Sequence, residues 1–179
     1  MQETYTLEVA GLTRDLAICP VNEKMSIAAF VMFSDVELTI ASAAELLKRV
    51  PDCDVFITAE SKGIPLAYEM SRQSGKRYIL ARKSKKLYMK RAIAVPVRSI
   101  TTDRLQELYL DEDDMSYLRD KRVLIVDDVV STGESMAALE LLVGEAGGDI
   151  VGRAAVLAEG DAMNRKDLVY LAPLPLFFH

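Results

Sequence analysis

The sequence predicts an α/β protein with a mostly parallel central sheet and helices on both of its faces. From about residue 36 to residue 159, short extended segments alternate with helical ones, which is the pattern of consecutive βαβ units. Several extended segments, such as Val123–Val126, are apolar throughout, as expected for strands that are buried on both faces. No repeat or low-complexity linker divides the chain, so we expect one domain over residues 1–179.

The N-terminal part contains three extended segments followed by a helix. Thr4–Val9 alternates with a period of two residues, which indicates a strand. Residues 10–20 contain a turn and a second short strand, and Ala28–Phe33 forms a third apolar run. A helix is predicted over residues 36–50, because Asp35 can cap its first turn and a proline follows its end.

The middle of the chain begins the regular alternation. Residues 54–59 form a short β-branched strand, and a four-residue loop connects it to a helix at 64–75. Pro65 lies in the first turn of that helix and Gly75 just past its last turn, which are the positions that these residue types favour. A further strand is predicted at 77–81.

The remaining elements continue the same pattern toward the C-terminus. The helix among them places Met136, Leu139, Val143 and Ala146 on one face, and Gly147 is expected to end it. These elements are strands at 93–100, 105–111, 122–126 and 150–159, a helix at 133–148, and one or two short strands at 167–178 that prolines divide.

Composition excludes several classes of protein and of site. The net charge of −5 argues against a general nucleic-acid binder, and no apolar run approaches the roughly 20 residues that cross a bilayer. Cys19 and Cys53 are too few for a disulfide framework and the N-terminus lacks a signal pattern, so we expect a cytoplasmic protein. His179 is the only histidine, which argues against a Ser-His-Asp triad, a Cys-His pair or a histidine-based metal site.

One stretch of sequence carries the clearest chemistry. Asp127 and Asp128 directly follow a buried strand, and residues 129–135 then form a small turn with three hydroxyl side chains and one glycine, ahead of a helix. Two carboxylates can bind a vicinal diol or lie near a divalent cation, while turn amides and a helix N-terminus favour a phosphate. The pattern therefore predicts a ribose 5-phosphate site. The alternative is that the acids only begin a turn and that Ser131 or Thr132 only caps the helix.

Two further loops are expected at the same carboxyl edge of the sheet, where open α/β sheets bind ligands. Residues 60–63 precede a helix, and taken alone they are best explained as an ordinary β–α turn. Residues 82–91 carry six lysines and arginines. The simplest interpretation of this run is a solvated basic surface. A nucleic-acid-binding patch is the alternative, which the net charge disfavours. Neither a Walker P-loop nor a dinucleotide fingerprint is present.

The stretch from Arg122 to Ser135, with its apolar strand, two acids, two apolar residues and a small–Thr–Gly turn, resembles the phosphoribosyl-pyrophosphate motif of type I phosphoribosyltransferases. The resemblance covers roughly residues 35–156. It implies that Asp127 and Asp128 hold the ribose hydroxyls and that the loop at 130–135 holds the 5′-phosphate. Glu134 departs from the glycine common in adenine-type members, and we expect its side chain to point away from the phosphate.

The resemblance also assigns the other two loops. The backbone of Ser61 to Gly63 would cradle pyrophosphate, in a loop whose peptide is sometimes cis in this family, and Lys62, Arg82 and Lys83 would neutralise it. Mg²⁺ is the implied cofactor, held chiefly through the substrate, and no protein ligand is assigned to it. The implied catalytic residues are Asp127, Asp128, Lys62, Arg82 and Lys83, and the implied substrate contacts are Ser61, Gly63, Val129, Val130, Ser131, Thr132, Gly133, Glu134 and Ser135.

For the whole chain, the resemblance implies an N-terminal hood over the base (residues 1–27), a core (28–160) and C-terminal strands (161–179). It also implies a homodimer and a purine base as the second substrate. We favour adenine, with xanthine or a non-catalytic sensor of phosphoribosyl pyrophosphate as alternatives. Base identity stays open at this point, because Thr102 stands near the position of a glutamate that adenine enzymes typically carry.

Overall fold

A computed structural model describes residues 3–89, 91–97 and 106–179. Its centre is a parallel sheet with the strand order β10-β9-β8-β4-β5, which confirms the predicted fold class. Crossover connections place β8 next to β4, although 62 residues separate the end of β4 from the start of β8. These strands are β4 (Val55–Ala59), β5 (Arg77–Ala81), β8 (Arg122–Val130), β9 (Asp149–Glu159) and β10 (Leu168–Leu174).

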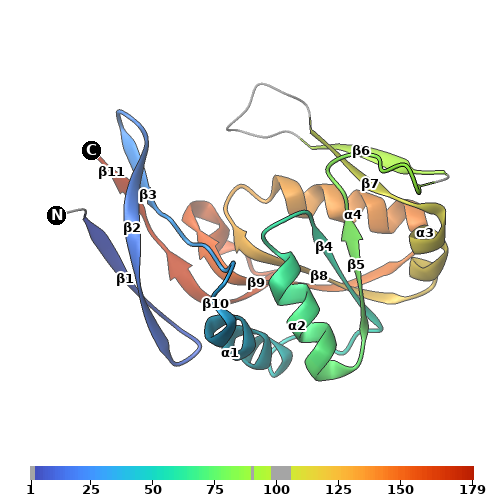
Figure 1. Ribbon diagram of the computed structural model, residues 1–179, viewed down its shortest axis with the longest axis horizontal. Coiled ribbons are helices and arrows are strands. Elements are labelled where there is room, and N and C mark those ends of the chain that lie inside the picture. Colours follow the sequence, from blue (N-terminus) through green and yellow to red (C-terminus); the bar gives the residue numbers. More distant parts are fainter. Residues whose placement is uncertain (1–2, 90, 98–105) are drawn as a thin grey trace.

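Helices cover both faces of this sheet, as Figure 1 shows. Successive residues of a strand point to opposite faces, so Val123 and Ile125 pack in one hydrophobic cluster and Leu124 in the other. Helices α1 and α2 contribute to the cluster that contains Leu124, and α3 and α4 to the opposite one. The helices are α1 (Val36–Leu47), α2 (Ile64–Ser74), α3 (Glu112–Leu118) and α4 (Glu134–Ala146), with a 3-10 helix η1 (Gly160–Asn164) after β9.

Two smaller antiparallel sheets flank the core. One joins the N-terminal strands to the last strand of the chain, so residues 1–27 do not form this sheet alone. It lies at the left of Figure 1, where both termini are found. The other consists of β6 and β7. The first sheet contains β1 (Thr4–Val9), β2 (Leu12–Asn22), β3 (Met25–Ala28) and β11 (Leu176–Phe178); the second contains β6 (Ile93–Val97) and β7 (Gln106–Leu110).

Arginine at position 14 ties the first antiparallel sheet to the core. The Arg14 Nε lies 2.7 Å from Asp35 Oδ2 and its Nη2 lies 2.8 Å from Glu37 Oε2, at the start of α1. Asp35 also caps α1 as predicted, since its Oδ1 accepts a hydrogen bond from Leu38 N at 3.0 Å. Hydrogen bonding to Arg14 holds the pKa of Asp35 below its usual value, so this contact persists at neutral pH.

The structure corrects several details of the sequence prediction. The strand predicted at 122–126 continues to Val130, because Val129 and Val130 still pair with β9. Helix α3 was not predicted. Its first turn is acidic and only Met115 and Leu118 are buried, so the apolar pattern that indicates a helix is too short to recognise. The run at 28–33 is not a strand beyond Ala28, although Phe30 and Met32 in it are buried.

Other boundaries also move or fall outside the described part. Strand β2 is longer than expected and extends past its proline to Asn22, and α1 ends at Leu47 instead of residue 50. Thr102, the position that bears on base identity, lies outside the described residues. The same is true of the outer ends of the strands predicted at 93–100 and 105–111.

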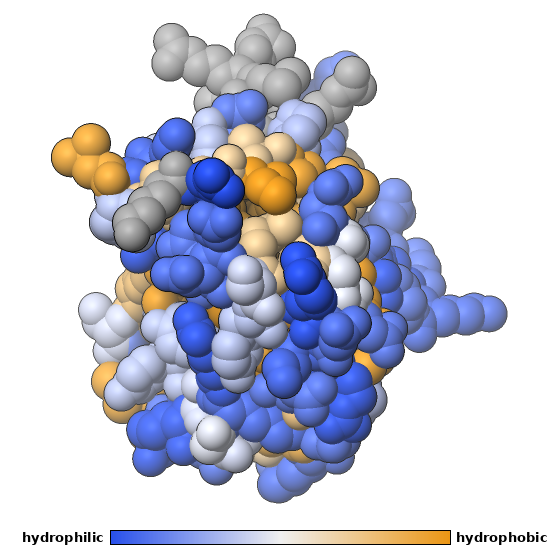
Figure 2. Space-filling model, turned by 90° about the vertical axis from the view of Figure 1, so that its right-hand side faces the viewer, coloured by the Kyte–Doolittle hydropathy of each residue, from blue (hydrophilic) through white to orange (hydrophobic). Residues whose placement is uncertain are grey.

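The surface seen in Figure 2 is mostly hydrophilic, with a limited apolar area in its upper part. Within the described ranges, no helix is long and apolar enough to cross a membrane.

Candidate active site

The two adjacent acids lie inside β8, three and two residues before its end, and not in the turn that follows. Asp127 is half-buried, and its Oδ1 accepts a hydrogen bond from Asp128 N at 2.9 Å. Asp128 is only 4% exposed, and its Oδ2 has no hydrogen-bond partner among the described residues. A buried carboxylate oxygen without a partner is costly, so an acid held this way is better explained by a ligand than by a turn.

Burial raises the pKa of both carboxyl groups. For Asp127 the pKa is well above the usual value, first because of burial and then because of the neighbouring Asp128 charge. For Asp128 burial is again the main cause of the raised pKa, and the positive charge of Lys62 opposes it in part. Ionised together, the two acids therefore destabilise the free protein and favour a ligand that supplies donors or positive charge.

A pH-dependent free energy of unfolding should follow from these shifts. Above the ordinary aspartate pKa of about 4, the folded protein binds more protons at this pair than the unfolded chain does, so stability falls as the pair ionises with rising pH. The D127N/D128N variant cannot ionise at these positions, so it should not lose stability in this way. We expect its free energy of unfolding to exceed that of the wild type by an amount that grows from about pH 4 upward. Urea denaturation of both free proteins across this range measures the difference; an advantage independent of pH would contradict the raised pKa values.

The predicted phosphate loop lies directly beyond the acids. Ser131 to Gly133 connect β8 to α4, and Gly133 adopts φ +79°, a left-handed conformation that glycine accepts readily. No side chain caps α4, which removes the alternative that Ser131 or Thr132 serves as its cap. Residues 129–136 and Asp127 line a cavity of about 150 Å³ here. The uncapped N-terminal amides and the positive end of the helix dipole leave this cavity suited to an anion.

The predicted pyrophosphate loop packs against Asp127. Gly63 is buried, and a methyl group at its Cα would overlap Thr58 Oγ1 and lie 3.0 Å from Asp127 Oδ1. The Glu60–Ser61 peptide in this loop is cis. Residues from all three predicted loops line one cavity of about 310 Å³. Its lining consists of Ala59, Glu60, Ser61, Lys62, Lys83, Asp127, Asp128, Val129, Ser131 and Ser135.

The basic segment begins where β5 ends. Arg82 is held by two backbone hydrogen bonds to Tyr109 of β7, at 2.9 and 2.8 Å. Lys83 is exposed and lines the cavity, whereas Arg82 does not line it and its guanidinium lies 3.6 Å from Glu60 Oε1. The structure thus brings Lys62, Lys83 and the two acids to one cavity and leaves Arg82 at its margin. Glu60 was missed as a site residue, although its place beside Ser61 in a short loop was a usable signal.

The oxygen ligands available suit a hard cation only in part. Mg²⁺ prefers carboxylate and other oxygen ligands, and Asp128 Oδ2 is a carboxylate oxygen without a hydrogen-bond partner among the described residues. In the described part of the chain, however, no group of three or more His, Cys, Asp or Glu side chains is arranged to hold a metal. The residues therefore fit Mg²⁺ if the substrate supplies most of its ligands.

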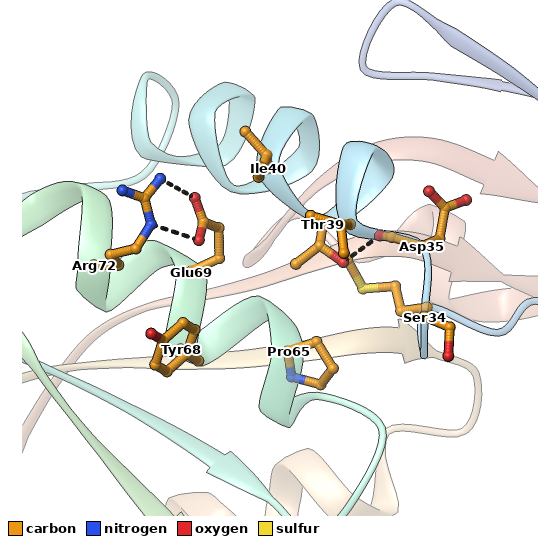
Figure 3. Close-up of a pocket in the computed structure, with 10 residues that line it drawn as sticks. Ser34, Asp35, Thr39, Ile40, Pro65, Tyr68, Glu69 and Arg72 are labelled. Atoms are coloured by element: carbon orange, nitrogen blue, oxygen red, sulfur yellow. Dashed lines mark hydrogen bonds and ion pairs between the residues drawn. The ribbon is translucent and has the colours of Figure 1, made fainter.

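A third cavity, of about 400 Å³, lies between α1 and α2 and shares no lining residue with the two cavities above. Figure 3 shows Ile40 from α1 with Pro65 and Tyr68 from α2 around it. At its edge Arg72 and Glu69 form an ion pair, with Nη2 and Oε1 2.7 Å apart. Its walls are mainly apolar and do not include either of the two acids, so it is not suited to a phosphate.

Comparison with known proteins now identifies the family. The model of the phosphoribosyl transferase domain family matches residues 35–170, which include β4 to β9 and all the loops described above. The chain belongs to the phosphoribosyltransferase family. Sequence relatives include the adenine phosphoribosyltransferase of Cenarchaeum symbiosum, 37% identical over 138 residues, with 72% of this chain and 78% of the relative covered.

Other relatives of similar identity carry different base names. The hypoxanthine/guanine phosphoribosyltransferase of Methanothermococcus okinawensis is 36% identical, covering 62% of this chain and 56% of the relative. The xanthine phosphoribosyltransferase of Brevibacillus brevis is also 36% identical, covering 56% of this chain and 51% of the relative. The chain thus spans little more than half the length of these two relatives.

Solved structures show the same fold. The adenine phosphoribosyltransferase from Thermoanaerobacter pseudethanolicus superposes with a TM-score of 0.74 at 18% identity, covering 88% of this chain and 95% of that one. The enzyme from Giardia lamblia, complexed with 9-deazaadenine, gives a TM-score of 0.69 at 16% identity, covering 88% and 93%. At these identities the match establishes the architecture of this phosphoribosyltransferase and nothing beyond it.

Proposed function

We propose that this protein is a purine phosphoribosyltransferase that converts adenine and phosphoribosyl pyrophosphate to AMP and pyrophosphate. The observation that carries the proposal is the acid pair of half-buried Asp127 and buried Asp128, placed between an uncapped helix N-terminus and a loop that carries Lys62. A sugar diol, a 5′-phosphate and a pyrophosphate require these three features side by side. The adenine phosphoribosyltransferase of Cenarchaeum symbiosum, at 37% identity over 138 residues, favours that base.

In the proposed reaction, a purine ring nitrogen forms a bond to C1 of the ribose as the bond from C1 to the pyrophosphate oxygen breaks. The electron pair of the broken bond leaves with pyrophosphate, and the ring N–H proton passes to solvent. Positive charge develops on the ribose, so Asp127 and Asp128 would stabilise it while they orient the hydroxyls. Lys62, Lys83 and Arg82 would stabilise the leaving group, and Mg²⁺ would neutralise further charge on the pyrophosphate when bound.

The remaining parts of the chain have proposed roles as well. The sheet of β1, β2, β3 and β11 would cover the base, and the single domain would work in the cytoplasm, where thiols such as Cys19 and Cys53 stay unpaired. The basic segment from residue 82 would close over the substrate and exclude water, which could otherwise capture the activated ribose.

A base panel tests the proposed activity. Adenine, xanthine, guanine, hypoxanthine and orotate are each supplied with phosphoribosyl pyrophosphate and Mg²⁺, and pyrophosphate release is measured. We expect turnover with adenine and its loss when a chelator removes Mg²⁺. Turnover with xanthine instead would move the assignment to the alternative base. Tight binding of phosphoribosyl pyrophosphate without turnover of any base would favour the non-catalytic sensor.

We also propose a homodimer, with the α1–α2 face as part of its interface. Val36, Ile40 and Tyr68 line the apolar cavity on this face and are 67%, 43% and 55% exposed. Exposed apolar clusters of this kind are typical of association surfaces, and a second copy would remove them from water. We expect sedimentation velocity at micromolar concentration to give a dimer that Ile40→Glu weakens. Leu141→Glu is the control, because Leu141 on α4 is also an exposed apolar residue (58%) but does not line this cavity. A wild-type monomer with full activity would contradict the dimer.

A further inference from the structure

Glu60 joins the two loops that the proposed function places around pyrophosphate. It stands in the turn after β4, and its backbone N donates to Ala81 O at 2.9 Å. Its Oε2 accepts a hydrogen bond from Lys83 N at 2.9 Å, and its Oε1 lies 3.6 Å from Arg82 Nη1. One side chain of the pyrophosphate loop therefore contacts both residues that begin the basic segment.

The contact falls at the point where the basic segment leaves the folded core. Arg82 is still held by its two backbone hydrogen bonds to Tyr109, whereas Lys83 is the first residue beyond that pairing. The hydrogen bond from Lys83 N is also the main cause that lowers the pKa of Glu60, so this side chain is ionised at neutral pH. An ionised acceptor makes a stronger hydrogen bond to an amide than a neutral one does.

A carboxylate at this position has an evident cost. Glu60 lines the same cavity as Lys62, Lys83 and the two acids of β8, so its charge would repel the pyrophosphate. The structure limits this cost because one oxygen is engaged by an amide and the other faces a guanidinium. The arrangement is explained if the side chain orders the basic groups before the substrate arrives, since pre-ordered groups lose less entropy on binding.

We propose that Glu60 is a positioning residue of the pyrophosphate site, which fixes Arg82 and the start of the basic segment beside the pyrophosphate loop. The proposal rests on the proposed function for its ligand, but the contact itself exists in the free protein. Glu60 need not touch the substrate, and its effect passes through the two basic residues. Pre-ordering of this kind acts on substrate and transition state alike, so it should alter KM more than kcat.

Two variants separate the hydrogen bond from the charge. Glu60→Ala removes both, whereas Glu60→Gln keeps an oxygen that can accept from Lys83 N. Hydrogen exchange at the Lys83 amide is measured in the free proteins, and KM and kcat for phosphoribosyl pyrophosphate are measured with Mg²⁺ and the active base. Glu45→Ala is the matched control, because it removes an acid from an exposed ion pair with Lys48 on α1.

We expect Glu60→Ala to speed exchange at the Lys83 amide and to raise KM about tenfold or more, with a smaller change in kcat. Glu60→Gln should restore slow exchange and most of the affinity, and Glu45→Ala should behave as the wild type. The proposal would be overturned if Glu60→Ala had the amide exchange rate and the KM of the wild type. It would also be overturned if Glu60→Gln were as impaired as Glu60→Ala. Failure of the wild type to bind phosphoribosyl pyrophosphate would instead refute the proposed function, while the exchange data still show whether Glu60 orders the segment.

Discussion

Replacing both acids of β8 by asparagine should weaken the binding of phosphoribosyl pyrophosphate by two orders of magnitude or more, while the free protein becomes more stable at neutral pH. Binding falls because a hydrogen bond to a charged group contributes roughly 1.5–3 kcal/mol, and two such acceptors are lost. Stability rises because the raised pKa values of Asp127 and Asp128 mean that their charges are costly in the folded state. Asparagine keeps the size of each side chain and can still accept from residue 128 N.

Calorimetric titration with phosphoribosyl pyrophosphate and Mg²⁺, beside thermal melts of the free proteins, measures both effects. A D113N/D149N variant is the control, since it removes two exposed carboxylates that do not line the cavity. An unchanged affinity together with a lower melting temperature would show that the two acids only support the local backbone. The assignment of the ribose site would then lose its strongest support.

We expect Gly63→Ala to reduce stability and activity more than any other substitution that adds one methyl group to the site. The backbone at Gly63 has φ −73° and ψ −9°, which alanine accepts, so the effect must come from contacts. The new Cβ would overlap the buried Thr58 Oγ1 and press on Asp127 Oδ1. Overpacking of this kind costs about 1–3 kcal/mol, and a shift of about 1 Å in a binding group can reduce activity roughly 100-fold.

A second substitution tests whether the clash is the cause. Thr58 Oγ1 has no hydrogen-bond partner among the described residues, so Thr58→Ala should cost little and should recover part of the stability lost in Gly63→Ala. Gly144→Ala in α4 is the control, because its Cβ would meet no atom within 4 Å. There alanine should stabilise the helix by about 0.5–1 kcal/mol. Additive effects of the Thr58 and Gly63 substitutions, measured by urea denaturation, would contradict the steric account.

The local pattern of the sequence determined much of the fold. Alternation of strands and helices, the cap at Asp35 and the glycines at 75 and 147 are short-range signals, and the structure has each where it was expected. The family could also be identified from one stretch, because the order of strand, acids, small turn and helix is contiguous in the chain. The end of that strand could not be predicted, since Val129 and Val130 extend β8 only by pairing with β9.

Tertiary structure alone decided what surrounds the two acids. Burial of Asp128, with an oxygen left unpaired, depends on strands and helices that are remote in sequence, and so do the raised pKa values. The contact between Gly63 and Asp127 exists because β4 and β8 are neighbours in the sheet, which no periodicity reveals. The same holds for Glu60 and the basic segment, and for β11, which joins a sheet made otherwise of N-terminal strands. Sequence patterns report hydrogen bonds and faces within a segment, whereas these features depend on which segments pack together.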